Sequence, residues 1–72
     1  MKGFIEVENI NGNKVLVNID YIIVIETITE IISQTEHRFV RFIYTYNLEP
    51  IKTLETYEEI KQKIEQAQGE NK

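Results

Sequence analysis

The hydrophobic pattern of this 72-residue chain changes its period once, near Leu54. Before that point, apolar residues recur at every second position in several short runs, which is typical of half-buried β-strands. After it, apolar residues recur at steps of three and four from Leu54 through Ile60 to Ala67, as on one face of an α-helix. We therefore expect an α+β fold, in which a small curved antiparallel sheet precedes one C-terminal helix. The expected sheet has four or five strands and is a meander or barrel-like.

Composition supports the strand assignment. Thirteen residues are isoleucine, against three leucines and one alanine. Side chains branched at Cβ pack well on a pleated sheet and lose rotamer freedom in a helix. A chain of this length has room for one small domain. We assign residues 1–68 to that domain and expect residues 69–72 to form a frayed C-terminal tail.

Turn chemistry indicates where the elements begin and end. Asn11-Gly12 suits a tight hairpin turn, because both residues tolerate positive φ angles. Asn18 and Asp20 favour a bend, and Thr56 with Glu59 three residues later is a capping box at the start of a helix. We predict strands over residues 4–9, 14–19, 21–32, 38–46 and 51–53, and a helix over residues 56–68.

The alternation also sorts the side chains of the sheet into two faces. We expect one face and the helix stripe to form the core, from Ile5, Val7, Val15, Val17, Ile23, Ile25, Val40, Phe42, Tyr44, Leu54, Ile60 and Ile64. The opposite face carries further apolar residues that one helix cannot cover: Ile22, Val24, Ile28, Phe39 and Ile43. We predict that these five residues form the interface of a homo-oligomer, joined through this face or through an unpaired strand edge. The alternative is a barrel-like monomer whose curled sheet encloses both sets.

The chain has few of the residue types on which enzymes rely. It contains no cysteine, one histidine, His37, and one serine, Ser33. A thiolate nucleophile, a cysteine zinc site and a multi-histidine metal site are therefore excluded by composition. We interpret His37 as a solvated loop residue, and the alternating acids such as Glu6 and Glu8 as the solvent face of a sheet. We expect no catalytic residue, no metal and no cofactor, so the chain is not predicted to be an enzyme.

The distribution of apolar and acidic residues predicts a soluble cytoplasmic protein without membrane contact. No apolar run reaches the roughly 18 residues that a membrane-spanning helix needs. Glu6 and Glu8 interrupt the region where a signal peptide would carry an unbroken apolar stretch. The net charge of −4 favours solubility and argues against a nucleic-acid partner, which usually selects a basic surface.

The strand from Arg38 to Tyr46 nevertheless interleaves arginines with aromatic residues, as some single-stranded nucleic-acid platforms do. Arg38, Arg41 and Phe39 would form the binding surface in that case. Packing of the aromatic residues under the helix is the competing interpretation, and we favour it because the rings fall on both faces of the strand. A small nucleic-acid-binding regulator is therefore kept as the alternative function.

The order of the motifs resembles that of the small flagellar and swarming-motility FlbD-like proteins. The resemblance rests on Ile10-Asn11-Gly12, on Asn18-x-Asp20-x-Ile22 before an apolar strand ending at Glu26, and on the helix entry Glu55-Thr56-Tyr57-Glu58-Glu59-Ile60. It spans roughly Phe4 to Ile64. The family's turn after the glutamate and its Asn-Gly turn before the last strand are absent here. The resemblance implies a compact β-meander with a C-terminal helix, and it carries over no catalytic or ligand-binding residue.

These observations together predict a small non-enzymatic protein-interaction or assembly module of bacterial type. The partners expected from the uncovered apolar face are a second copy of the chain or a larger protein. The size of the domain supports this expectation, because a chain this short buries only about 60% of the surface that its unfolded state exposes and gains stability from a partner.

Overall fold

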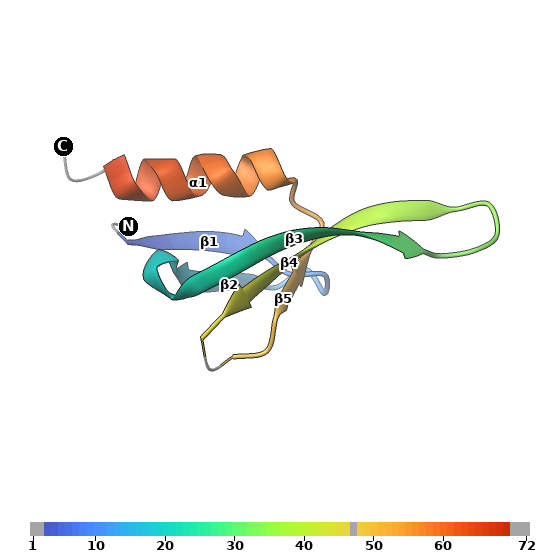
Figure 1. Ribbon diagram of the computed structural model, residues 1–72, viewed down its shortest axis with the longest axis horizontal. Helices are drawn as coiled ribbons and strands as arrows, with labels where there is room; N and C mark the ends of the chain where they lie inside the picture. The colour runs from blue at the N-terminus through green and yellow to red at the C-terminus, as the bar shows by residue number, and fades with distance from the viewer. Residues whose placement is uncertain (1–2, 47, 70–72) are drawn as a thin grey trace.

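The computed structural model describes residues 3–46 and 48–69. The elements run in the order β1 (Phe4–Glu8), β2 (Lys14–Asn18), a 3₁₀ turn η1 (Ile19–Tyr21), β3 (Ile22–Ile31), β4 (His37–Thr45), β5 (Ile51–Thr53) and α1 (Tyr57–Gly69). Figure 1 shows this arrangement, with α1 alongside β1 and the end of the β3–β4 hairpin projecting away from both. The prediction of an α+β fold with antiparallel strands and a C-terminal helix is confirmed.

The strands of the described residues form two sheets, where we expected one curved sheet. β1 pairs with β2, and β3, β4 and β5 form a three-stranded sheet with β4 in the centre. The separation arises at η1, where the side chain of Asn18 accepts a hydrogen bond from the backbone N–H of Asp20 over 3.0 Å. The predicted bend is therefore present, and it redirects the chain so that β3 pairs with β4 and not with β2.

The first hairpin forms as the Asn-Gly signal predicts. Ile5 lies opposite Val17 and Val7 lies opposite Val15 in the antiparallel register of β1 and β2. Gly12 has a φ of +85°, which a residue without Cβ adopts at no steric cost. The side chain of Asn9 closes the turn, because its Oδ1 accepts hydrogen bonds from the backbone of residues 11 and 13, each over 3.0 Å.

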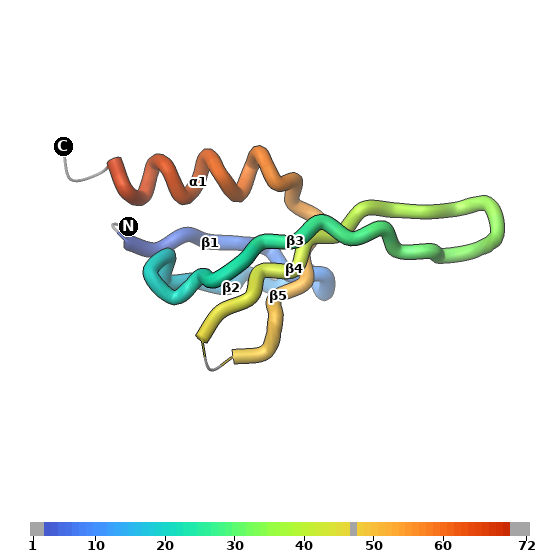
Figure 2. The backbone as a smooth tube through the Cα atoms, in the orientation of Figure 1, coloured from blue at the N-terminus to red at the C-terminus, as the bar shows by residue number. Residues whose placement is uncertain are grey.

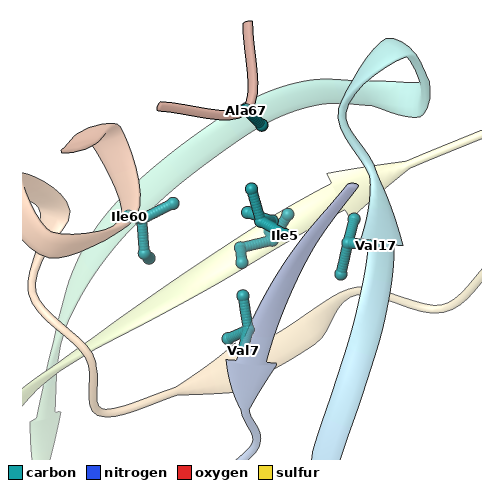
Figure 3. Packing of buried hydrophobic residues seen from close by; sticks show 6 residues of the cluster. Ile5, Val7, Val17, Ile60 and Ala67 are labelled. Atoms are coloured by element: carbon teal, nitrogen blue, oxygen red, sulfur yellow. The ribbon is translucent and has the colours of Figure 1, made fainter. Parts of the chain in front are cut away.

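The core lies between the β1–β2 hairpin, one face of the three-stranded sheet and α1. Figure 3 shows Ile60 and Ala67 of the helix near Ile5, with Val7 on the same strand as Ile5 and Val17 on β2. Ile43 of β4 completes the buried cluster. Partly buried residues surround it: Val15, Ile19, Ile22, Ile25, Ile51 and Ile64. Of the predicted core residues, Ile23 and Leu54 are instead about half exposed.

The prediction of which face of β4 points into the core was wrong. Ile43 is fully buried against the helix and the first hairpin, whereas we expected it at an interface. Val40, Phe42 and Tyr44 alternate with Ile43 and therefore lie on the opposite face of the sheet. Val40 is nonetheless buried there, and the other two are partly buried. Period-two alternation showed which residues share a face, but not which face the helix covers.

The helix begins with the predicted capping box. The backbone N–H of Glu59 donates to Thr56 Oγ1 over 3.1 Å, and the N–H of Thr56 donates to Glu59 Oε1 over 3.0 Å. The helix continues to Gly69, one residue past the predicted end. Of the predicted frayed tail, Gly69 is therefore helical, and residues 70–72 lie outside the described residues.

Candidate interaction surface

The outer part of the β3–β4 hairpin forms an arm, which we define as residues 29–39. Thr29 pairs with Phe39, Glu30 with Arg38 and Ile31 with His37. Figure 2 shows the arm extending beyond the helix and the other strands, and the Cα trace is 48 Å long against 24 and 20 Å in the other two directions. The arm exists because β3 and β4, of ten and nine residues, are much longer than β5 of three, so their far ends have no third strand.

Large apolar side chains on the arm are exposed. Ile31 is 72% exposed, Phe39 is 63% exposed and Ile32, just beyond β3, is 54% exposed. In the ladder, the pairs Ile31–His37 and Thr29–Phe39 alternate with the pair Glu30–Arg38. Paired residues share a face of the sheet, so Ile31 and Phe39 lie on one face of the arm. This face continues the face that carries Ile43 over the core, but the core ends before it reaches the arm. Such a surface is a candidate for contact with another protein.

The opposite face of the arm is held by an ionic cluster. The Nε and Nη2 atoms of Arg38 contact Glu30 Oε1 over 2.7 and 2.6 Å, and Lys52 Nζ of β5 contacts Glu30 Oε2. The hydrogen bonds from Lys52 and then Arg38 lower the pKa of Glu30 below its usual range. The cluster links all three strands at the base of the arm and limits the directions in which the arm can bend.

The end of the arm is a turn built on Ser33. Its Oγ accepts hydrogen bonds from the backbone N–H groups of Thr35 and Glu36 over 3.3 and 3.1 Å, and the N–H of Ile32 donates to the Glu36 carbonyl over 2.9 Å. His37 follows as the first residue of β4 and is exposed. The serine hydroxyl thus closes the turn, and the structure does not place His37 in hydrogen-bonding contact with it.

Arg41 lies at the base of the arm, where we had placed part of the alternative nucleic-acid surface. Its side chain is buried, and its guanidinium donates to the carbonyls of Glu55 and Leu54 over 2.6 and 2.8 Å and to that of Phe39 over 3.3 Å. Arg41 therefore holds the segment that enters α1 against β4. Arg38 lies on the other face of the strand, so the two arginines do not form one cationic surface.

The five residues predicted to form an interface do not lie on one exposed patch. Ile43 is buried in the core, and Ile22 is partly buried and packs against it. Val24 and Phe39 are exposed but lie on opposite faces of the sheet, and Ile28 is partly buried. The predicted interface did not include Ile31 and Ile32. The sequence offered a signal for them, because both are apolar residues beside the polar turn and no predicted helix or strand could cover them.

The backbone at the outer edge of β1 is satisfied by other parts of the chain. Lys63 Nζ donates to the Glu6 carbonyl over 2.7 Å, and the N–H of Glu8 donates to Glu55 Oε2 over 2.7 Å. Thr53 Oγ1 donates to the Glu8 carbonyl over 2.6 Å. Lys63 also binds Glu55. The helix and its entry segment therefore cover this edge.

The outer edge of β3 has no comparable cover. β3 is a terminal strand of its sheet, and its ladder with β4 runs from Ile22 to Ile31. Within the described part of the chain, the N–H of Ile22 donates to the Ile19 carbonyl of η1, and no other hydrogen bond from a loop or a side chain reaches the backbone of this strand. Its outward N–H and C=O groups are therefore free to pair with another strand.

A small apolar pocket lies away from the arm, between the first hairpin and the end of β4. It has a volume of about 190 Å³, and its lining includes Leu16, Tyr21, Thr45 and Leu48 but no charged residue. Among the residues that the structure describes, no three histidine or acidic side chains are placed to hold a metal ion. No helix in the described ranges is both long enough and apolar enough to cross a membrane.

Comparison with known proteins found no match: no protein-family model, no curated protein and no solved structure is significantly similar to this chain. Membership of the FlbD-like family thus stays a prediction from the sequence motifs.

Proposed function

We propose that this chain is a small cytoplasmic interaction module without enzymatic activity, which assembles with another protein chain through the β3–β4 arm. A second copy of the chain is the partner that we favour. The proposal is carried by the exposure of Ile31 and Phe39 on an arm that projects beyond the core. Extending two strands past their own core serves no purpose in packing the single chain, so the arm needs another explanation.

The energetics of the arm support this role. Full burial of an isoleucine or phenylalanine side chain contributes roughly 1.5–3 kcal/mol. Ile31, Ile32 and Phe39 forgo most of that contribution in the single chain and would recover it in a complex. The Glu30–Arg38–Lys52 cluster on the opposite face fixes the arm before binding, so less conformational entropy is lost on association.

The alternative function as a nucleic-acid-binding regulator receives less support. Such a surface needs cations that are free to reach phosphates. The guanidinium of Arg41 is bound to backbone carbonyls, and that of Arg38 is paired with Glu30. Phe39 remains exposed, but a single ring without free cations beside it does not make a stacking platform.

Site-specific photocrosslinking tests the proposal. Ile31→benzoylphenylalanine places a reactive group on the arm in the cell that makes the protein, and Gln66→benzoylphenylalanine, on the exposed face of α1, is the matched control. We expect a covalent adduct from position 31 and none from position 66. The mass of the adduct identifies a second copy or a larger protein. Absence of any adduct at position 31, with the variant folded by circular dichroism, would contradict the proposed function.

A further inference from the structure

We infer that β3 pairs with β3 of a second copy of this chain, antiparallel across a two-fold axis at Thr27, so that two three-stranded sheets become one sheet of six strands. The inference rests on the proposed function, because it names the strand through which the chain assembles, with Ile31 as the residue of the arm that takes part. It follows from three observations: the uncovered edge, the positions of the charges along it, and the exposed isoleucines at its two ends.

The edge itself is suited to pairing. Isolated proteins usually protect an edge strand with lysine, proline, a short length or a covering segment. β3 is ten residues long and contains neither lysine nor proline. The bulge between Ile22 and Val24 lies at its beginning and leaves the remainder regular. The edge of β1, in contrast, is protected by hydrogen bonds from Lys63 and to Glu55.

The free edge of β2 is a weaker candidate. That strand has five residues, half the length of β3. It also carries Lys14, whose Nζ lies 3.7 Å from Glu6 Oε1 of β1. A lysine on a short edge strand is a common means of preventing strand addition.

The two acids of β3 select the register. Like charges directly opposite each other destabilise a strand pair. A two-fold axis at Glu26 would place Glu26 opposite its own copy, and an axis at Ile28 would place Glu26 opposite Glu30 twice. An axis at Thr27 places Glu26 opposite Ile28 and Glu30 opposite Val24. It also allows seven regular residues of each strand, 24–30, to pair, more than an axis at residue 25 or 29 allows, and it leaves Ile23 of the bulge opposite Ile31 at each end.

The same register joins the exposed isoleucines. Ile23 at one end of β3 is 53% exposed, and Ile31 at the other end is 72% exposed. With the axis at Thr27, Ile23 of each copy lies opposite Ile31 of the other. The contact therefore occurs twice, as a two-fold interface requires. Both residues of this contact, Ile23 and Ile31, come from the same strand, so we assign the partner as a second copy of the chain.

Disulfide formation tests the register, because the chain has no cysteine of its own. In Thr27→Cys the two new thiols face each other across the axis. Opposite residues of an antiparallel pair have Cα atoms about 4.5–5.5 Å apart, within the range of a disulfide. Thr29→Cys is the matched control: it is an exposed threonine on the same face, but its copy would lie about 13 Å away along the strand. We expect air oxidation to convert most of Thr27→Cys to a covalent dimer and to leave Thr29→Cys as single chains.

The wild-type chain provides a second measurement. In sedimentation equilibrium we expect the apparent mass to rise with concentration towards twice the 8.5 kDa of the chain, and Thr27→Lys to remain at the mass of one chain while keeping its circular dichroism spectrum. Preferential crosslinking of Thr29→Cys, or a wild-type chain that stays monomeric at all concentrations, would overturn the inference. In that case a photocrosslinked adduct with a different protein at position 31 would leave the proposed function standing, whereas the lack of any adduct would overturn both.

Discussion

The hydroxyl of Thr53 donates a hydrogen bond to the backbone carbonyl of Glu8 over 2.6 Å, and this bond joins the two sheets of the protein. Thr53 is fully buried, and its Oγ1 also accepts a hydrogen bond from the N–H of Glu55 over 3.1 Å. One side chain therefore satisfies two backbone groups at the point where the strands end and the helix segment begins.

We predict that Thr53→Val destabilises the protein by about 1–3 kcal/mol, because the valine keeps the shape of threonine but leaves the Glu8 carbonyl and the Glu55 N–H without their partner. Urea denaturation followed by circular dichroism measures the loss. Thr53→Ser is the control, since it keeps the hydroxyl and loses a methyl group. A smaller loss in the valine variant than in the serine variant would show that the methyl group, and not the hydrogen bond, matters at this position.

The carbonyls of Leu54 and Glu55 depend on Arg41 in the same region. We predict that Arg41→Met destabilises the protein by on the order of 3 kcal/mol, since two partly buried carbonyls lose a charged donor. Arg38→Met should cost less than about 1 kcal/mol, because Arg38 is more exposed and its loss leaves Glu30 with Lys52. Urea denaturation gives both values. A stable Arg41→Met variant that loses salt-dependent retention on single-stranded DNA would restore the nucleic-acid alternative.

The two faces of β4 give a further test. We predict that Ile43→Ala destabilises the protein by about 2–5 kcal/mol, because it opens a cavity in the core. Phe39→Ala, four residues earlier on the same face but on the arm, should change the stability of the single chain by no more than about 0.5 kcal/mol. Both variants are compared by urea denaturation at one low protein concentration. Equal losses would mean that the arm is covered within the single chain.

The capping box at Thr56 has a measurable value for the helix. We predict that Thr56→Ala costs about 1 kcal/mol, because the N–H of Glu59 loses its acceptor. Thr56→Ser keeps an acceptor oxygen and should recover most of that loss. The midpoint of the thermal transition at 222 nm separates the two variants. A serine variant as unstable as the alanine variant would argue that the methyl group of Thr56 makes the important contact.

The ionic cluster at the base of the arm predicts a dependence on pH. Hydrogen bonds from Lys52 and Arg38 lower the pKa of Glu30 in the folded protein below its usual value of 4.5. Because the folded pKa is below the unfolded one, the stabilisation from Glu30 is fully present above pH 4.5 and is lost as the pH falls through the folded pKa. We expect Glu30→Gln to be less stable than wild type at pH 7 and to lose less stability between pH 5 and pH 3. Parallel urea titrations of the two proteins at these pH values measure the difference.

Removing the partners of Glu30 supplies the control. Lys52→Gln and Arg38→Gln each take away one of the interactions that lower the pKa of Glu30. Each should reduce the acid-dependent part of the stability, and Lys52→Gln should reduce it more. An unchanged acid dependence in both variants would place its origin outside the cluster, for example at Glu59, whose pKa is also lowered by hydrogen bonds from the backbone and side chain of Thr56.

Local features of the sequence predicted most of the elements. The Asn-Gly turn, the Asn18–Asp20 bend and the Thr56–Glu59 capping box act over a few residues, so their effects do not depend on the rest of the fold. The predicted boundaries of β1, β2, β3 and β4 lie within one residue of the observed ones, and those of β5 coincide.

The candidate surface was harder to predict, because it depends on where the core ends. The alternation along β4 places Phe39 and Ile43 on one face, and the sequence pattern treats them alike. In the structure the helix and the first hairpin cover Ile43 and stop before Phe39, so one residue is fully buried and the other is 63% exposed. The positions of the helix and the first hairpin over the sheet decide this, and no local signal in the sequence reports those positions.

The sequence alone thus determined the strands, the turns, the helix and the grouping of side chains into faces, since each depends on near neighbours and on backbone sterics. The tertiary structure decided which face of β4 is covered, that Arg41 binds backbone and not solvent, and that the edge of β1 is covered while that of β3 is free. These outcomes depend on contacts between residues far apart in the chain, such as Lys63 with Glu6 and Thr53 with Glu8. A pattern of period two or 3.6 carries no information about such pairs.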